Sequence, residues 1–350
     1  MENKDELLLK SAYENGASDL HITVGVPPVM RINGLLKRFG DEPLLPIDTE
    51  RMAKSLIPQH LWETYKDKGE LDFSYGIPGI SRFRINAYHQ RSCAALAIRV
   101  IPTHIPTIDE LKLPPILKKL CEKPQGLILV TGSTGSGKST TLAAMIDYMN
   151  KNMRKHVITL EDPIEYLHKH GLSIIDQREV GFDTRSFKHG LRSALRQDPD
   201  VILVGEMRDL ETIQTAITAA ETGHLVLGTL HTSSAPTTID RIIDVFPHEQ
   251  QTQIRIQLAS VLIGIISQRL FPTADRKGRR AATEILINNA AIANLIRNEK
   301  IHQIPNVLQT SRHEGMHLLA TSIKELLASE QIAREATIPF FEGNDSNGTF

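Results

Sequence analysis

The chain has 350 residues, enough for about two domains and a substantial hydrophobic core, and its two cysteines cannot form a four-sulfur zinc site. Its 40 Lys and Arg residues are balanced by 41 Asp and Glu residues, so the net charge of -1 provides no general attraction for nucleic acid or an anionic membrane. The longest apolar run, Val261–Ile266, is far shorter than the roughly 18–20 residues of a membrane span, and the chain starts without a secretion signal. We therefore expect a cytoplasmic protein without direct membrane insertion.

The first hundred residues are predicted to form a small α+β domain. Residues 17–32 contain two short apolar stretches separated by a glycine and two prolines, a pattern typical of strand, turn and strand. Residues 81–90 and 94–101 also have the pattern of strands, and the residues between these two regions carry apolar side chains at helical spacing. The proline-rich segment 101–115 disfavours a continuous helix and suits a linker between domains.

After the linker, short apolar strands alternate with helices. This alternation predicts an α/β domain whose parallel sheet is covered by helices on both faces. The expected strands are residues 126–132, 156–163, 173–180, 201–206 and 224–231, and the expected helices are residues 140–150, 184–197 and 209–223. From residue 237 onward the chain is expected to be mostly helical, with its longest helix over residues 249–270. The polar residues 342–350 are expected to form a flexible tail.

A glycine-rich motif provides the strongest functional signal. Residues 132–139 read GSTGSGKS, which matches the phosphate-binding pattern GxxxxGK[ST], and they lie between a predicted strand and a predicted helix. The glycines let the backbone wrap around phosphates, Lys138 reaches the β- and γ-phosphate oxygens, and the Ser139 hydroxyl is a ligand for magnesium. The motif predicts ATP and Mg2+ as the bound species. The predicted nucleotide-binding residues are Gly132, Ser133, Thr134, Gly135, Ser136, Gly137, Lys138, Ser139 and Thr140.

Two predicted strand ends carry carboxylates that could orient a water molecule. Glu206 ends the strand VILVGE, and Glu161 ends the strand HVITLE, at the edge of a parallel sheet where ligands bind. A carboxylate at such a place can also cap a helix or be the first solvated residue, and Asp209 is better explained as a cap. Together with the phosphate-binding loop, Glu206 and Glu161 are predicted to be catalytic.

Two histidines bracket the predicted strand HLVLGTLH. His224 and His231 are seven positions apart, so they face opposite sides of a straight strand and do not form a simple metal-binding pair. His231 lies at the carboxyl end of the strand, near the expected γ-phosphate. Spacing alone leaves open whether either histidine is catalytic or a polar residue at a strand end.

Four segments, in this order and spacing, resemble the Walker A, Asp box, Walker B and His box of the secretion-type hexameric ATPases. They read TGSTGSGKSTT, ITLEDPIEY, ALRQDPDVILVGEMRDLET and TGHLVLGTLHT, within residues 126–232. The flanking segments ASDLHI, PPVMRING, SRFRIN and AIANLIRNEK narrow the resemblance to the PilT family, the type IV pilus twitching-motility (retraction) ATPases. The resemblance covers nearly the whole chain.

The resemblance implies a domain order and an assembly. Residues 1–100 would form an amino-terminal PAS-like domain, residues 101–115 the linker, and residues 116–341 a RecA-like P-loop ATPase domain with a helical carboxyl-terminal region. Six subunits would form a ring with ATP between neighbours, peripheral at the inner face of the cytoplasmic membrane. The implied partner is an inner-membrane pilus platform protein, and nucleic acid is not an expected partner.

The resemblance also implies roles for the residues at the strand ends. Glu206 would polarise the attacking water, Glu161 would support water or magnesium, and His231 belongs to the His box and is grouped with the catalytic residues. Gly205 precedes Glu206 where many P-loop ATPases have Asp, so magnesium would depend more on Ser139, phosphates and water.

Arginines of the amino-terminal domain are implied to act on the neighbouring subunit. Arg82 and Arg84 in SRFRIN are the candidates, with Arg99 as a further one. An arginine supplied in trans is worth roughly 10³ to 10⁵ in rate, so hydrolysis would require the assembled ring. The alternative, that these arginines are only solvent-facing cations of a strand, stays open.

These features predict an ATPase: a hexameric motor that couples Mg-ATP hydrolysis to type IV pilus retraction. One alternative is a pilus-assembly or type II secretion ATPase, but those relatives usually carry a further amino-terminal domain and a four-cysteine zinc insertion. Another is a nucleic-acid motor, which the near-neutral charge and the 5% aromatic content disfavour. Ala293 in AIANLIRNEK replaces the Arg common in the family, which leaves a weakly hydrolysing accessory nucleotide-binding subunit as a third alternative.

Overall fold

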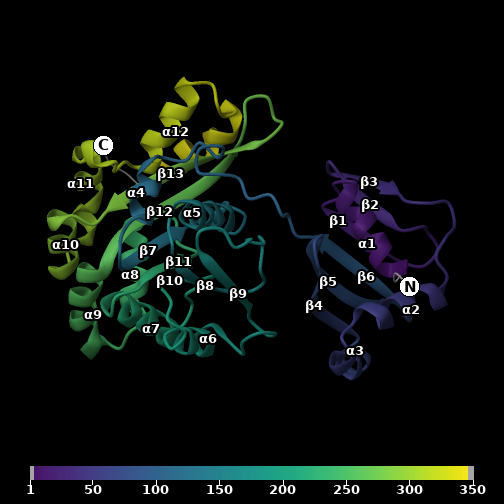
Figure 1. Cartoon of the computed structure of the whole chain (residues 1–350). Helices are drawn as coiled ribbons and strands as arrows, with labels where there is room; N and C mark the ends of the chain where they lie inside the picture. The colour runs from purple at the N-terminus through teal and green to yellow at the C-terminus, as the bar shows by residue number, and fades with distance from the viewer. Residues whose placement is uncertain (1–3, 346–350) are drawn as a thin grey trace. The chain divides into compact units, whose positions relative to one another are not determined.

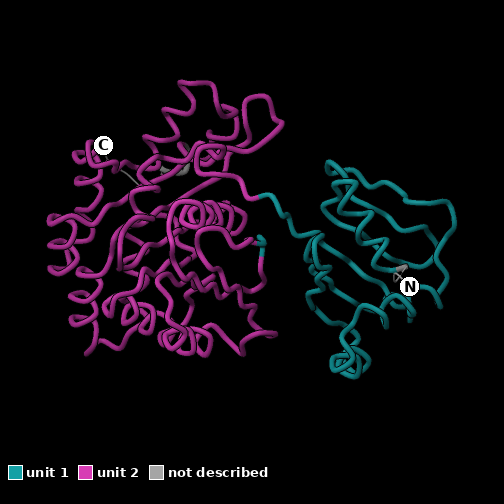
Figure 2. Tube along the Cα trace, in the orientation of Figure 1, with its two compact units in different colours: residues 1–104, 165–167 teal, residues 105–164, 168–350 magenta. Residues whose placement is uncertain are grey.

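The computed structural model describes residues 4–345, and the chain divides into two compact units. The amino-terminal unit contains the residues up to 104 together with 165–167, and the carboxyl-terminal unit contains 105–164 and the residues from 168 onward (Figure 2).

The amino-terminal unit is a six-stranded antiparallel sheet with helices packed on one face (Figure 1). Its strand order is β3-β2-β1-β6-β5-β4, and apolar residues from the sheet and from α1 and α2 form its core. The strands are β1 (Asp19–Ile22), β2 (Val29–Ile32), β3 (Leu35–Arg38), β4 (Glu70–Ile77), β5 (Ser81–Gln90) and β6 (Cys93–Val100). The helices are α1 (Lys4–Glu14), α2 (Pro46–Leu56), the 3-10 turn η1 (Gln59–Leu61) and α3 (Trp62–Lys68).

The carboxyl-terminal unit is built on a seven-stranded sheet of order β13-β12-β7-β11-β10-β8-β9. Six of these strands are parallel and β13 is antiparallel to β12. The strands are β7 (Gly126–Thr131), β8 (His156–Glu161), β9 (Ile174–Glu179), β10 (Val201–Val204), β11 (Leu225–Leu230), β12 (Leu262–Pro272) and β13 (Arg279–Ile287). The helices are α4 (Ile116–Cys121), α5 (Lys138–Asn152), α6 (Phe187–Ala194), α7 (Leu210–Glu221), α8 (Ala235–Asp244), α9 (His248–Val261), α10 (Ala290–Arg297), α11 (Ile304–Thr310), α12 (Leu319–Ala328) and α13 (Ile338–Asp345), with 3-10 turns η2 (Ile301–Gln303), η3 (Arg312–Glu314) and η4 (Arg334–Thr337).

Helices cover both faces of this sheet. Ile128 and Val130 of β7 pack in a cluster with residues of α4 and α5, whereas Leu127 and Leu129 pack with residues of α6 to α11. Every residue of β7 and β11 is buried, which explains why their sequences are continuous apolar runs rather than alternating ones. The predicted α/β class, with a parallel sheet between helical layers, is confirmed.

The prediction of one long helix over residues 249–270 is wrong. Helix α9 ends at Val261, and the next residues form β12, which pairs with β7 and β13. Three isoleucines in LIGIIS favour a strand, and pairing with the sheet interior outweighs the helical continuity of the preceding residues. Of the segment 342–350 expected to be a flexible tail, residues 342–345 belong to α13, and residues 346–350 lie outside the described part.

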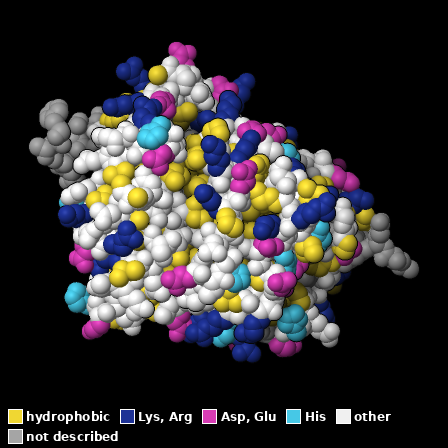
Figure 3. Space-filling view, turned by 60° about the vertical axis from the view of Figure 1, so that its left-hand side comes forward, with side chains coloured by type: hydrophobic (Ala, Val, Ile, Leu, Met, Phe, Trp, Pro, Cys, Tyr) yellow, Lys and Arg dark blue, Asp and Glu magenta, His cyan; other side chains and the backbone are white. Residues whose placement is uncertain are grey.

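Charged side chains of both signs are interspersed on the face of the molecule drawn in Figure 3. Within the described part of the chain, no helix combines the length and apolarity that a bilayer crossing requires.

Candidate functional site

The glycine-rich loop connects the buried strand β7 to helix α5. Gly132 has φ 144°, and a Cβ atom there would lie 2.4 Å from the carbonyl oxygen of Gln268. Gly137 has φ 89° and forms the N-cap of α5. Both conformations are open to glycine and strained for other residues, so the motif's first and last glycines are required by the backbone path.

Lys138 begins α5 and is largely buried beneath the loop. Its Nζ donates hydrogen bonds of 2.8 Å and 3.0 Å to the carbonyl oxygens of Gly132 and Ser133. Burial lowers the pKa of Lys138, and the negative charge of Glu206 opposes that shift. The ammonium group is thus held at the helix N-terminus, where an anion is favoured, and within the electrostatic reach of Glu206.

Four residues of the motif are exposed: Ser133, Thr134, Gly135 and Ser139. The Ser139 hydroxyl lies in the first turn of α5, beside Lys138, and is accessible to a ligand. Among the described residues, no group of three or more His, Cys, Asp or Glu side chains is arranged to hold a metal ion.

The two predicted catalytic glutamates follow neighbouring strands. β8 and β10 are parallel, with Leu160 opposite Val204. The amide of Gly205 donates a 2.8 Å hydrogen bond to the Leu160 carbonyl oxygen, which brings the two strand ends together. Glu161 and Glu206 consequently lie at the same edge of the sheet.

Glu206 is the centre of a charged cluster. Its Oε1 lies 3.0 Å from Nε2 of His231 and also accepts a hydrogen bond from Nε of Arg208. The Glu206 side chain is mostly buried, whereas Arg208 is exposed. These residues line a cavity of about 410 Å³ together with Leu230 and Arg241. The structure therefore places His231 in contact with Glu206, a contact that the spacing of residues in the sequence alone could not show.

Glu161 makes different contacts. Its Oε1 accepts hydrogen bonds of 2.6 Å from the Thr159 hydroxyl and 3.0 Å from Nε2 of Gln177 on β9. These two donors orient the carboxylate at the end of β8.

Two further residues considered in the sequence analysis, Asp209 and His224, cap or end helix α7. Asp209 accepts a 2.9 Å hydrogen bond from the Thr212 amide and caps α7, as predicted. His224 lies beyond the other end of α7, with Nδ1 3.0 Å from the Ala219 carbonyl oxygen. His224 therefore terminates a helix and does not join the cluster around Glu206.

Arg82 and Arg84 alternate along β5 with the buried Phe83 and Ile85, so both arginines face away from the core of the amino-terminal unit. Arg84 lies opposite Arg99 on β6.

Arg99 forms a 3.2 Å ion pair with Asp19 of β1. Arg84, Arg99, Asp19 and His21 line a cavity of about 230 Å³ in the amino-terminal unit. The cavity is therefore lined by Arg84 and Arg99 together with the carboxylates of Asp19 and Asp72, and Asp19 is paired with Arg99.

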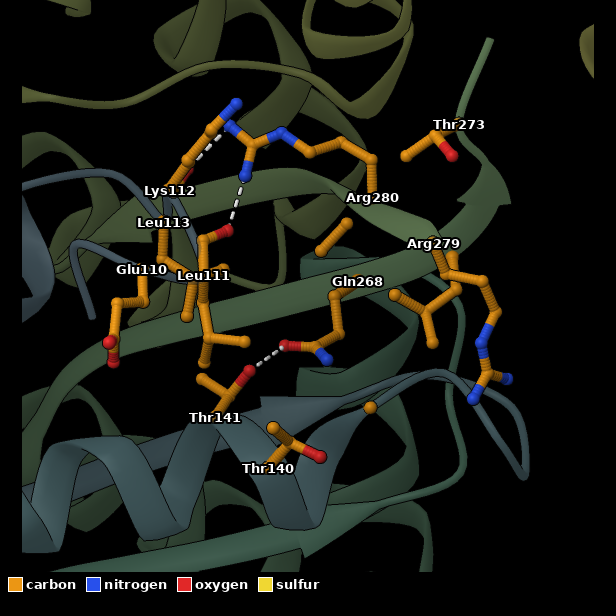
Figure 4. A pocket seen from close by; sticks show the side chains of 13 residues that line it. Glu110, Leu111, Lys112, Leu113, Thr140, Thr141, Gln268, Thr273, Arg279 and Arg280 are labelled. Atoms are coloured by element: carbon orange, nitrogen blue, oxygen red, sulfur yellow. Dashed lines mark hydrogen bonds between the residues drawn. The ribbon is translucent and has the colours of Figure 1, made fainter. Parts of the chain in front are cut away.

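Another cavity, of about 440 Å³, lies beside the phosphate-binding loop (Figure 4). Gln268 of β12 donates a 2.7 Å hydrogen bond to the Ser136 carbonyl oxygen and accepts one of 2.9 Å from the Thr141 hydroxyl. Arg280 of β13 donates to the carbonyl oxygens of Leu111 and Lys112, which fixes the wall formed by residues 110–113.

Sequence reasoning missed this cavity. Gln268 and Arg280 belong to strands that the sequence did not predict, and residues 110–113 were interpreted only as linker. The polar Gln268 within the apolar run LIGIISQRL was the one available signal, because a buried amide requires partners.

A strand, glycine-rich loop and helix at the edge of a parallel sheet, with a buried lysine and a strand-end glutamate, define a P-loop nucleotide-binding ATPase. The family model described as "Type II/IV secretion system protein" matches residues 67–337. The chain belongs to this family of secretion ATPases, and within it to the PilT family of pilus retraction ATPases.

Individual relatives match over most of their length. The chain is 47% identical to the "Type IV pilus retractation ATPase PilT" of Pseudomonas aeruginosa, over 94% of this chain and 95% of that protein. It is 48% identical to the "Twitching motility protein" of Neisseria gonorrhoeae, over 88% and 83% of the two chains. The crystal structure of the pilus retraction motor PilT with bound ADP matches with a TM-score of 0.87 and 50% identity, covering 94% of each chain.

Proposed function

We propose that this chain is an ATPase that drives type IV pilus retraction. The observation that carries the proposal is the pairing of Glu206 with His231 at the sheet edge, within electrostatic reach of the P-loop Lys138. The family membership confirms the predictions of an ATPase and of a retraction motor.

The residues at the sheet edge have complementary roles in hydrolysis. The loop from Gly132 to Thr140 surrounds the phosphates, and Lys138 moves from its own loop carbonyls to the β- and γ-phosphate oxygens. Glu206 accepts a hydrogen bond from the attacking water, and His231 fixes the orientation of that carboxylate. Glu161, held by Thr159 and Gln177, supports water from the neighbouring strand end.

Magnesium fits the loop as a partner of the nucleotide. The exposed Ser139 hydroxyl would be its protein oxygen ligand, and because Gly205 supplies no carboxylate, phosphate oxygens and water would provide the remaining ligands. When bound, the ion neutralises charge on the phosphate oxygens.

The cavity beside the phosphate-binding loop, of about 440 Å³, is suited to the base and ribose of the nucleotide. It adjoins Gly137 and Thr140 at the start of α5, and its volume lies in the usual range for small-molecule sites. Gln268 connects this cavity to the loop, since its amide bonds to both Ser136 and Thr141.

A ring of six subunits accounts for the arginines of the amino-terminal unit. Arg82 and Arg84 face away from that unit's core and can act on the ATP of a neighbouring subunit. A cytoplasmic ring at the inner face of the membrane would be able to contact a pilus platform protein in that membrane.

The test is the number of surface pili after deletion of the gene in its own host. Excess pili on cells that do not twitch are expected, with rescue by the unmodified gene and not by Glu206→Gln. Cells without pili would instead indicate an assembly or secretion motor and would overturn the proposed direction of work.

A further inference from the structure

A buried glutamate on β13 faces the first turns of two helices. Glu284 is 6% exposed, and its Oε1 accepts a 2.8 Å hydrogen bond from the amide of Ala235, the first residue of α8. The backbone amide of Leu319, the first residue of α12, faces the same carboxylate and lowers its pKa. One side chain thus accepts a hydrogen bond from the leading amide of α8 and faces the leading amide of α12.

The helix ends explain why a carboxylate is retained in this position. Helix N-termini favour negative charge, and two of them face Glu284. Burial raises the pKa of Glu284, and the backbone amides of Ala235 and Leu319 oppose that rise. The N-cap residue of α12 is Leu318, whose side chain makes no capping hydrogen bond, so the Glu284 carboxylate is the negative group near this helix start.

A short series of contacts leads from α8 to the hydrolytic glutamate. Thr238, in the first turn of α8, shares a 2.6 Å hydrogen bond with the hydroxyl of Thr232. Thr232 directly follows His231, whose Nε2 lies 3.0 Å from Oε1 of Glu206. The first turn of α8 is therefore linked to the residue that directly follows His231.

The part of β13 that carries Glu284 also contacts α12 and the residues just before it. β13 pairs with His317 through the backbone of Ile285, and the Ser322 hydroxyl of α12 accepts a hydrogen bond from the Thr283 amide. The start of α12 is consequently attached to the same stretch of β13 that carries Glu284.

We propose that Glu284 is a positioning residue for ATP hydrolysis: it holds the first turn of α8 so that His231 stays against Glu206, and it ties that turn to α12. This inference rests on the proposed hydrolysis at Glu206 and extends it, because it connects the ATP site to the carboxyl-terminal helices through one side chain.

The first measurement is steady-state ATP turnover and ADP affinity of the full-length protein. Glu284→Ala is expected to lower kcat by between about tenfold and about a hundredfold, because a displacement near 1 Å of a catalytic group has effects of this size. KM and ADP affinity should change little, since the phosphate-binding loop is not in the connection. Glu284→Gln keeps one acceptor oxygen and should recover part of the rate.

Asn289→Ala is the matched control. Asn289 accepts a 3.0 Å hydrogen bond from the Ile292 amide and caps α10, so its loss costs about 1 kcal/mol of stability without touching His231 or α8. A similar fall in kcat for Asn289→Ala would show that general destabilisation explains the effect and would overturn the proposal.

A double variant separates positioning from packing. If Glu284 acts through His231, Glu284→Ala should have little further effect on kcat in a His231→Ala background. Hydrogen exchange should accelerate in Glu284→Ala over both residues 231–238 and residues 319–323. Independent multiplication of the two rate effects, or unchanged exchange at either segment, would refute the link.

The two proposals fail in different ways. If the unmodified chain does not hydrolyse ATP, the proposed function fails and the positioning role for Glu284 falls with it. If the unmodified chain hydrolyses ATP and Glu284→Ala does so at the same rate, only the role of Glu284 is wrong.

Discussion

A Cβ atom built on Gly205 would lie 2.8 Å from the carbonyl oxygen of Leu160. The Gly205 amide donates a hydrogen bond to the same oxygen, so the ends of β8 and β10 are in direct backbone contact. This contact aligns Glu161 and Glu206, the next residues along each strand. It also leaves no room for Asp at position 205, which gives a structural reason for the single carboxylate of this Walker B motif.

Gly205→Ala is therefore expected to destabilise the carboxyl-terminal unit by about 1–3 kcal/mol, because the added methyl group forces the strand ends apart. ATP turnover should fall further than the loss of folded protein explains, since Glu206 moves with its strand. Thermal unfolding and kcat on one preparation test both effects. Gly278→Ala is the control, because the nearest atom to its Cβ would be 3.8 Å away. Wild-type behaviour of Gly205→Ala would contradict the packing argument.

Lys138→Ala and Glu206→Gln are expected to separate nucleotide binding from hydrolysis. Lys138→Ala removes the cation that meets the phosphates, so binding of fluorescent ADP should be lost. Glu206→Gln should retain ATP while kcat falls by at least about a hundredfold, as expected for loss of a general base. Glu249→Gln, an exposed glutamate of α9, is the matched control. Turnover by Glu206→Gln at the unmodified rate would show that another group orients the water.

Arg82→Ala and Arg84→Ala are each expected to lower kcat by at least about tenfold without loss of ADP binding, because two arginines share a role worth roughly 10³ to 10⁵ in related NTPases. Arg91→Ala, in the exposed turn after β5, should leave turnover unchanged. The measurement is turnover against protein concentration, with the oligomeric state determined in parallel. Full activity in a demonstrated monomer would exclude a role in trans.

His168 makes the carboxyl-terminal unit sensitive to acid. Burial lowers the pKa of His168 from 6.5 to about 4, against the opposing attraction of Asp147. Above pH 6.5 the imidazole is neutral in both the folded and the unfolded chain, so His168 does not make the free energy of unfolding depend on pH there. Between pH 6.5 and pH 4 only the unfolded chain takes up the proton, and the free energy of unfolding falls.

Titration of His168 is expected to lower the free energy of unfolding by about 2 kcal/mol between pH 7 and pH 5, since one pKa unit corresponds to 1.36 kcal/mol. Urea unfolding followed by circular dichroism at the two pH values measures it. His168→Phe should reduce the difference by that amount, whereas His248→Phe, at an exposed position, should not. Equal pH dependence in the unmodified chain and in His168→Phe would contradict the assignment.

Much of the fold and the phosphate site could be predicted from local patterns. The loop from Gly132 to Ser139, the strand ends at Glu161 and Glu206 and the cap at Asp209 each depend on neighbouring residues, so spacing and residue type are sufficient evidence for them. The alternation of apolar strands with helices likewise determines a parallel sheet, because both faces of such a sheet must be covered. The hexameric ring and the choice of pilus retraction over assembly came from the family resemblance, because no local sequence pattern indicates them.

Contacts between residues far apart in the sequence were decided by the tertiary structure alone. The strand β12 forms because LIGIIS pairs with β7 in the sheet interior, and a burial energy of that kind depends on a partner more than a hundred residues away. The same pairing places Gln268 beside the phosphate-binding loop, and β13 places Glu284 at the start of α8. Glu206, the carboxylate proposed to orient the attacking water, is thus evident from its strand, whereas the side chains that hold it in place are found only where the strands meet.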